Sequence, residues 1–224
     1  MPEITELHAF AHDLRHYLRE SITQSQLAQR RFGDSLTPEV KASFEAIAKV
    51  GLECDRLIKA MVEYVEAGAS AVKLWPLKRA MQALPSETRR TIDEAKGRLS
   101  VDWPVGEEID IAESLQDVWR ELITNAAKFR HPDRPLEIAL QIQVTPERVW
   151  FRCSDTGIGI PLEHQEAIFV PFRRLHARNV YPGFGLGLSR CRKIMRSLNG
   201  DLLAVEASDG AALEGWYPRD ENLV

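Results

Sequence analysis

Three groups of residues in this sequence have the types and spacing needed to hold a phosphorylated ligand. Glu121, Asn125 and Lys128 follow one another at steps of four and three, so they share one face of a helix. The amide oxygen of Asn125 suits Mg²⁺ and the ammonium of Lys128 neutralises phosphate, while the Glu121 carboxylate can share the metal or orient and deprotonate a nucleophile. Two glycine-rich turns follow, "DTGIGI" at 155–160 and "GFGLGL" at 183–188. Alternate glycines let a backbone approach phosphate, and a helix N-terminus offers free N–H groups to it.

Neither glycine turn matches the common phosphate-binding motifs. The sequence contains no G-x-x-x-x-G-K-[ST] segment, so a P-loop is excluded. A dinucleotide fold needs a strand–loop–helix context with an acidic residue about 20 positions further on, and that context is missing. Each motif alone is weak, but the helix face and both turns in one domain favour a nucleotide site of another type.

The start of the chain carries three imidazoles, at His8, His12 and His16. Neighbouring pairs at this spacing could bind Zn²⁺ or Ni²⁺, but a step of four drifts around the helix, so one ion cannot easily take all three. His12 follows an apolar seam position, Ala11, and we therefore expect its side chain to point outward. A neutral imidazole exposed in this way is a nucleophile.

Two long helices are predicted over residues 1–67. Apolar residues recur at alternating steps of three and four, and the break between the helices contains Gly33, Thr37 as an N-cap and Pro38 at the first helical position. The seam consists of Ile4, Leu7, Ala11, Leu14, Leu18, Val40, Phe44, Ile47, Gly51, Cys54, Ile58, Met61 and Val65. Two helices cannot cover two such seams, so we expect a homodimer through residues 1–67 that forms a four-helix bundle. The alternative is packing on the chain's own C-terminal half.

After a small-residue linker at 66–71, the pattern changes to mixed helices and strands. We expect a short strand and a helix over 73–84, a strand over 97–104, a helix over 111–129 with Ile111 on its buried face, a hairpin over 136–156, a helix over 185–199 stopped by Gly200, and closing strands over 201–207 and 210–218. This order indicates an α+β sandwich.

Composition excludes several classes of protein. The 29 Lys and Arg against 33 Asp and Glu give a net charge of −4, which argues against binding nucleic acid by bulk electrostatics. No apolar run is long enough for a membrane helix, and the charged N-terminus is no signal peptide. Three widely spaced cysteines fit a reducing compartment, so we expect a cytoplasmic protein without disulfides.

The motifs together resemble a known family. The order "ELITNAAKF", "DTGIGI", "IFVPF", "GFGLGL" is similar to the N, G1, F and G2 boxes of the sensor histidine kinase ATP-binding domain, and "FAHDLRHYLR" resembles its H box. The local sequences "NAAKFRHPDRP" and "PFRRLHARNVYPGFGLGLSRCRKI" are most similar to those of phytochrome-type histidine kinases. The resemblance implies an N-terminal helical hairpin, 1–67, for dimerisation and histidine phosphotransfer. It also implies an α/β sandwich ATPase domain of the histidine kinase, gyrase and Hsp90 (GHKL) type over 68–224.

The resemblance also implies a role for each matching residue. His12 would be the phosphoacceptor with Asp13 polarising it, and Glu121 a polar catalytic residue. Asn125 would coordinate Mg²⁺, with Glu121 one turn earlier. The residues implied to bind ATP are Asn125, Lys128, Phe129, Asp155 (the adenine amino group), Gly157, Gly159, Phe169 and Phe172 (the lid), Arg174 (the γ-phosphate), Gly183, Gly185 and Gly187.

The function implied is two-component signalling. ATP would phosphorylate His12, and the phosphoryl group would pass to an Asp of a response regulator receiver domain. If Met1 is the natural start, input would come from a separate sensor protein. Two alternatives remain open: a pseudokinase or histidine phosphotransferase that docks a regulator without ATP turnover, and a gyrase-type ATPase that uses Glu121 as base.

Five positions depart from the family pattern. Tyr17 replaces a helix-bending Pro, so a straighter first helix is expected. His16 stands where relatives carry Thr or Asn for dephosphorylation, which leaves phosphatase activity open. Phe184 replaces a small hydroxyl residue in the G2 box, where a bulky ring could pack the lid or obstruct a phosphate. Glu214 and Gly215 interrupt an apolar strand.

Overall fold

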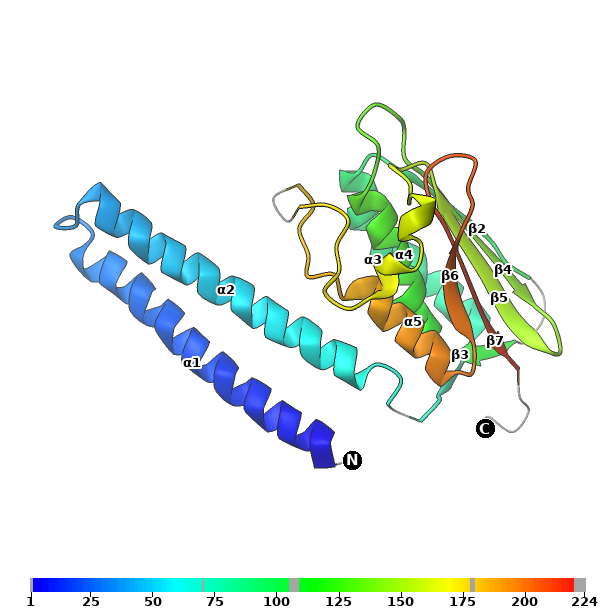
Figure 1. The fold of residues 1–224 in the computed structure, drawn as a ribbon, viewed down its shortest axis with the longest axis horizontal. Coiled ribbons are helices and arrows are strands. Elements are labelled where there is room, and N and C mark those ends of the chain that lie inside the picture. Colours follow the sequence, from blue (N-terminus) through cyan, green and yellow to red (C-terminus); the bar gives the residue numbers. More distant parts are fainter. Residues whose placement is uncertain (1, 70, 105–108, 178–179, 220–224) are drawn as a thin grey trace. The chain divides into compact units, whose positions relative to one another are not determined.

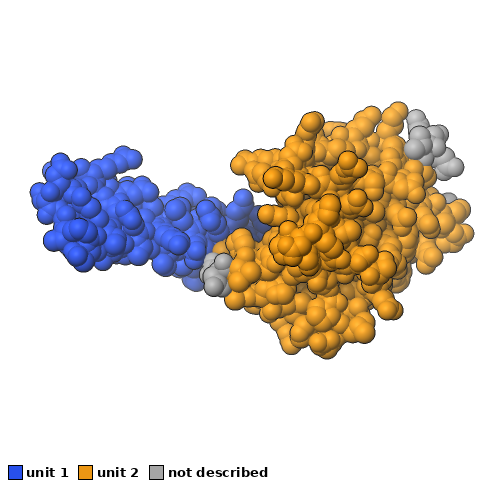
Figure 2. Space-filling model, turned by 90° about the horizontal axis from the view of Figure 1, so that it is seen from above, with its two compact units in different colours: residues 1–66 blue, residues 67–224 orange. Residues whose placement is uncertain are grey.

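The structure, a computed structural model, describes residues 2–69, 71–104, 109–177 and 180–219 (Figure 1). The chain divides into two compact units, residues 1–66 and 67–224, drawn in blue and orange in Figure 2. The division falls one residue before the expected boundary because the second helix ends at Glu66. Within the described residues, none of the helices combines the length and apolar character needed to cross a membrane.

The first unit is a helical hairpin of α1 (Pro2–Phe32) and α2 (Pro38–Glu66), as predicted. The α1 helix runs without a break past Tyr17, which agrees with the absence of Pro there. Gly51 of α2 faces Ile22, so closely that a Cβ would lie 2.7 Å from its side chain. The Arg15 guanidinium donates to Asp55 at 2.7 Å and joins the two helices at one register.

The second unit is a five-stranded sheet covered on one face by helices (Figure 1). The strand order is β2-β4-β5-β7-β6; β2 is parallel to β4 and the other neighbours are antiparallel. Strands alternate between buried and outward positions, and the buried side meets the helices in one apolar core. The elements are α3 (Leu77–Glu94), β2 (Arg98–Asp102), α4 (Leu115–Lys128), β4 (Glu137–Val144), β5 (Arg148–Asp155), 3₁₀ turns η1 (Leu162–His164) and η2 (Ala167–Phe169), α5 (Gly187–Ser197), β6 (Asp201–Val205) and β7 (Ala212–Pro218).

The prediction of a helix over 111–129 was wrong at its start. Ile111 lies in a strand, β3 (Asp110–Ala112), which pairs antiparallel with β1 (Leu74–Pro76). The Ala112 N–H donates to the Tyr217 hydroxyl at 3.0 Å, so a residue 105 positions away satisfies it. Both partners of this segment are distant in sequence, and the helix begins only at Leu115.

The end of α5 also differs from the prediction. The helix ends at Ser197, and Asn199, not Gly200, adopts the left-handed conformation with φ 61°. The Gly200 N–H donates to the Met195 carbonyl at 3.0 Å, which closes the last turn. Gly200 is needed for another reason, because a Cβ there would lie 1.8 Å from the Trp216 carbonyl oxygen of β7.

The unusual Glu214 and Gly215 both have a structural partner in β5. Glu214 accepts a hydrogen bond from Arg152, its cross-strand neighbour, at 2.8 Å. Gly215 lies under the buried Phe151 ring, where a Cβ would approach Phe151 Cζ to 2.2 Å. The departure in β7 is therefore accommodated by a large ring on the adjacent strand.

Candidate functional site

The polar face of α4 is arranged around Glu121. Its Oε1 accepts from the Asn125 amide nitrogen at 3.2 Å, and its Oε2 lies 3.1 Å from Arg190 Nη2 on α5. Gly187, the first residue of α5, allows this close approach, since a Cβ there would lie 2.0 Å from Glu121 Oε1. Because the Asn125 nitrogen is used by Glu121, its carbonyl oxygen is the atom available to a ligand.

Two cations lie close together at the end of α4. Burial, opposed by Glu121 and reinforced by Arg174, lowers the pKa of Lys128. The Lys128 ammonium lies 4.6 Å from the centre of the Phe129 ring, and a Cβ at Gly183 would lie 2.9 Å from Nζ. The structure therefore brings Lys128, Arg174 and the second glycine turn together from distant positions in the sequence.

The first glycine turn is organised by Asp155 at the end of β5. Its Oδ1 accepts from the backbone N–H of Gly157 at 2.7 Å and of Ala211 at 3.3 Å. Burial raises the pKa of Asp155, and these two hydrogen bonds offset part of that rise. Among the described residues none donates to Oδ2, so this half-buried carboxylate retains an acceptor for a ligand.

The glycine turns contain the strained backbone of the site. Gly159, Gly183 and Gly185 have φ of 80°, 137° and 74°. Phe172 also has a positive φ, 64°, which costs a non-glycine residue about 1–2 kcal/mol. Its N–H donates to the Gly185 carbonyl at 2.9 Å, so the F box and the G2 box hold each other in this conformation.

An aromatic cluster joins the predicted lid, the segment between Phe172 and Gly183, to α4. The Phe129 ring lies 4.9 Å from Tyr181 and 6.0 Å from His176, and the two lid rings are 5.2 Å apart. The Arg174 guanidinium donates to the Tyr181 carbonyl at 2.5 Å. The described part of the lid is thus packed onto the residue predicted to line the nucleotide pocket.

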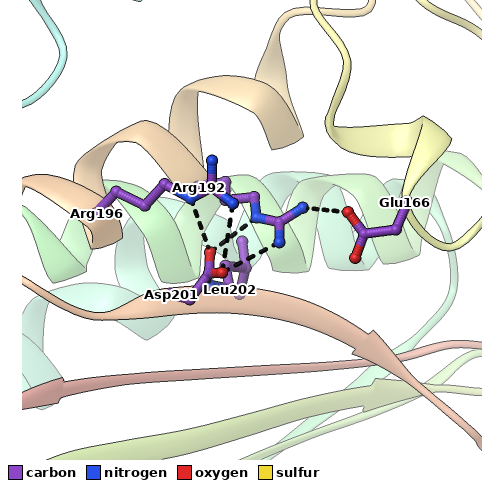
Figure 3. Close-up of polar contacts among 5 residues, drawn as sticks. All are labelled: Glu166, Arg192, Arg196, Asp201 and Leu202. Carbon is purple, nitrogen blue, oxygen red and sulfur yellow. Dashed lines mark hydrogen bonds and ion pairs between the residues drawn. The ribbon is translucent and has the colours of Figure 1, made fainter.

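Phe169 and Phe172 have different environments, although both were predicted to anchor the lid. Phe169 is buried in the core, with the Arg192 guanidinium 4.7 Å from its ring centre, whereas Phe172 is 53% exposed. Arg192 of α5 binds Asp201 at 2.7 Å and Glu166, just before η2, at 2.7 Å (Figure 3). The stacking of Arg192 on Phe169 and the Arg192–Glu166 ion pair therefore hold the F box against α5, and of the two phenylalanines only Phe172 remains accessible.

His12 lies on α1 in the first unit and points outward, as predicted: its side chain is 83% exposed. Its Nδ1 is 3.4 Å from Asp13 Oδ1, and Asp13 is 73% exposed. His8 instead contacts Glu66 at the end of α2, with 2.6 Å between Nε2 and Oε1. Throughout the described chain, no group of three or more His, Cys, Asp or Glu side chains is placed to hold a metal.

The second-unit residues fit a magnesium nucleotide. Two neighbouring cations, Lys128 and Arg174, favour an anionic ligand, because their mutual repulsion contributes to the lowered pKa of Lys128. Asp155 offers a buried acceptor to an amino group, and the oriented amide oxygen of Asn125 is a ligand of the type that Mg²⁺ prefers. Glu121 is less suited to direct coordination, because both of its oxygens are already in contact with protein groups.

Sequence reasoning missed three contributors to this site. No individual role was predicted for Arg190 and Ala211, or for Tyr181 within the lid, and each acts through a partner far away in the sequence: Glu121, Phe129 and Asp155. The only local signal was the position of Arg190 three residues after Gly187, on the first turn of α5. Their contributions follow from the packing of α5, the lid and β7 around α4 and β5.

These features define a GHKL-type nucleotide-binding sandwich joined to a helical hairpin. Residues 110–219 match the family described as histidine kinase-, DNA gyrase B-, and HSP90-like ATPase. The chain is 32% identical to Cyanobacterial phytochrome A of Nostoc sp. over 206 residues. This alignment covers 87% of this chain and 26% of the phytochrome. It is 28% identical to the circadian input-output histidine kinase CikA of Synechococcus elongatus, over 97% of this chain and 30% of that protein.

Solved structures show the same fold. Full-length ShkA, in a complex with AMPPNP, superposes with a TM-score of 0.66 at 20% identity, covering 95% of this chain and 44% of ShkA. The Acinetobacter baumannii histidine kinase AdeS gives 0.62 at 18% identity, over 92% of this chain and 98% of that one. The chain belongs to the sensor histidine kinase family and comprises its core, a helical hairpin with a GHKL ATPase domain. It spans about a quarter to a third of the length of the phytochrome and CikA relatives.

Proposed function

We propose that this chain is an ATP-dependent protein-histidine kinase that phosphorylates His12 and passes the phosphoryl group to an Asp of a response regulator receiver domain in the cytoplasm. The observation that carries the proposal is the convergence of Asn125, Lys128, Asp155 and both glycine turns in the second unit. A histidine phosphotransferase that only docks a regulator has no use for these groups, so they favour the kinase over that alternative.

Each part of the nucleotide has a matching group in the proposed site. Asp155 accepts the adenine amino group, while Gly157 and Gly159 shape the pocket for the ring. Lys128 and Arg174 neutralise phosphate, and Phe129 lines the pocket. The triphosphate is assigned to the turn that contains Gly183, Gly185 and Gly187, since its first glycine lies against the Lys128 ammonium. Mg²⁺, held through the Asn125 oxygen, would neutralise charge on the phosphates. Phe172 is the accessible lid anchor.

The geometry at His12 favours reaction through Nε2. When Nδ1 carries the proton and faces Asp13, the lone pair of the neutral ring lies on Nε2. Attack forms a bond from Nε2 to the γ-phosphorus and breaks the bond to the β,γ-bridging oxygen, which leaves with ADP. Asp13 stabilises the positive charge that develops on the ring, and the Nδ1 proton is then lost to solvent. Transfer of the phosphoryl group to the regulator carboxylate restores the imidazole.

Dimerisation through residues 1–67 is part of the same proposal. Few hairpin residues are buried within one copy, and apolar side chains remain exposed at a heptad spacing along α2: Val40 at 40%, Ile47 at 49% and Met61 at 39%. Cys54, at the remaining heptad position, is half-buried. A stripe of this kind is the seam that a second hairpin covers in a four-helix bundle.

Incubation with γ-labelled ATP and Mg²⁺ tests the proposal. We expect label that is stable in base and labile in acid, and that is absent from His12→Gln. His16→Gln is the matched control, because this imidazole is exposed one turn further along α1 and should leave labelling intact. Label that persists in His12→Gln would refute the assignment. Nucleotide binding without labelling of the wild-type chain would favour the pseudokinase, and steady ATP hydrolysis in His12→Gln would favour the gyrase-type ATPase.

A further inference from the structure

Glu121 is held by contacts on both of its carboxylate oxygens. Oε2 lies 3.1 Å from Arg190 Nη2, while Oε1 receives the Asn125 amide at 3.2 Å. The Glu121 and Arg190 side chains are 24% and 21% exposed, so this ion pair between α4 and α5 is mostly removed from solvent. A carboxylate in such a place needs a cation, and Arg190 supplies it.

We infer that Arg190 is a positioning residue for the metal–nucleotide site, acting through Glu121 on Asn125. Arg190 keeps the Glu121 carboxylate turned along α4, and Glu121 then holds the Asn125 amide nitrogen. The Asn125 carbonyl oxygen is thereby presented in one orientation. This inference rests on the proposed function, since it assigns Asn125 the metal ligand of a magnesium nucleotide.

Gly187 lies in contact with the Glu121 side chain and limits the positions that its carboxylate can take. A Cβ at this position would lie 2.0 Å from Glu121 Oε1 and 2.7 Å from its carboxyl carbon, so the carboxylate lies directly against the start of α5. Arg190 is three residues further along the same helix and reaches the same carboxylate. The start of α5 therefore performs two tasks: its glycine makes space for the carboxylate, and its arginine orients it.

Glu121 is then a positioning group whose negative charge is balanced by the Arg190 guanidinium. Loss of Arg190 should therefore affect the orientation of Asn125, and with it the metal-dependent part of nucleotide affinity. The affinity measured without metal should change little.

Binding of the non-hydrolysable nucleotide AMPPNP, measured by calorimetry on the full chain with Mg²⁺ and with EDTA, tests this inference. The ratio of the two affinities is the metal enhancement. We expect Arg190→Gln to reduce it by about tenfold, as is typical of a lost orienting partner, and Arg190→Lys to reduce it by about threefold, because the charge is kept but the geometry is not. Arg196→Gln is the matched control, because Arg196 lies on the same helix and contacts Asp201 instead.

A double-mutant cycle with Glu121→Gln separates the possible routes. If Arg190 acts through Glu121, Arg190→Gln lowers the enhancement in the wild-type background and changes it less than about twofold in the Glu121→Gln background. Equal losses in both backgrounds would mean that Arg190 contacts the nucleotide itself, and would overturn the inference. An unchanged enhancement in the single variant would also overturn it.

The readout does not depend on phosphoryl transfer. A wild-type chain that binds AMPPNP but never labels His12 would refute the proposed function and leave the cycle interpretable. Circular dichroism checks that each variant is folded. Arg190→Lys keeps the inference testable if Arg190→Gln does not fold, since a retained charge with altered geometry should still lower the enhancement relative to wild type.

Discussion

Replacing Asp155 by Asn should separate nucleotide binding from stability. The Asp155 carboxylate accepts two backbone N–H groups through Oδ1, and an amide oxygen can accept the same two. The substituted amide nitrogen would then face the adenine amino group, so a donor meets a donor. Losing a hydrogen bond to a charged acceptor costs about 2 kcal/mol, which corresponds to about a 30-fold weaker Kd.

The thermal shift that a nucleotide produces gives the size of the effect. At a ligand concentration of about 100 times the wild-type Kd, binding adds about 2.7 kcal/mol, which raises the Tm of a unit of this size by about 5–10 °C. At the same concentration, a variant with about 30-fold weaker binding gains only about 0.9 kcal/mol, or about 2–3 °C. Differential scanning calorimetry with and without Mg²⁺ and AMPPNP resolves this difference.

Without nucleotide, the same variant should be at least as stable as wild type at pH 7. Burial raises the pKa of Asp155 above its unfolded value, so its contribution to stability is greatest below about pH 4 and falls as pH rises through the folded pKa. The Asp155→Asn substitution removes the buried charge, so the unliganded Tm should lose its dependence on this group. Asp102→Asn, at an exposed carboxylate in β2, is the control. A full nucleotide shift in Asp155→Asn, or an unliganded Tm several degrees lower, would refute the reasoning.

Three further predictions concern other parts of the chain. Lys128→Met should weaken nucleotide binding at least tenfold but raise the unliganded Tm at pH 7. Burial lowers the pKa of this ammonium, so its charge destabilises the folded state. Calorimetry measures both the affinity and the Tm, and a lower unliganded Tm would contradict this. Burial raises the Asp201 pKa, but hydrogen bonds from Arg192, the Leu202 N–H and Arg196 outweigh it and lower the pKa to about 2. Arg192→Gln removes only the first of these donors, so it should cost about 1 kcal/mol at pH 7. This stability is present above about pH 4 and is lost as pH falls toward 2, so urea midpoints in wild type should fall over that range more steeply than in the variant, and parallel profiles would argue against the pairing. Ile47→Glu should convert the proposed dimer to monomer in light scattering, whereas Leu52→Glu, at an exposed site off the heptad stripe, should not; a dimeric Ile47→Glu would place the interface elsewhere.

Most elements, and the order of the motifs, could be predicted from local patterns in the sequence. The seam spacing predicted α1 and α2, with Thr37 and Pro38 at the start of the second, because helix periodicity and capping are local properties. The alternation in 136–156 predicted the β4–β5 hairpin for the same reason. The outward position of His12 followed from Ala11 beside it, which is buried at 6% exposure. Each of these features depends on neighbours within a few residues.

Features that depend on partners far along the chain could not be predicted and became visible only in the folded structure. Ile111 lies in a strand because β1 and Tyr217 satisfy its segment, although its spacing also fits the apolar face of α4. Gly200 is required by the approach of β7, while Asn199 takes the left-handed turn. Arg190 gains its partner because α5 packs beside α4, which brings two charges 69 positions apart within 3.1 Å. No local pattern encodes such a meeting, since it depends on how two helices are placed on one sheet.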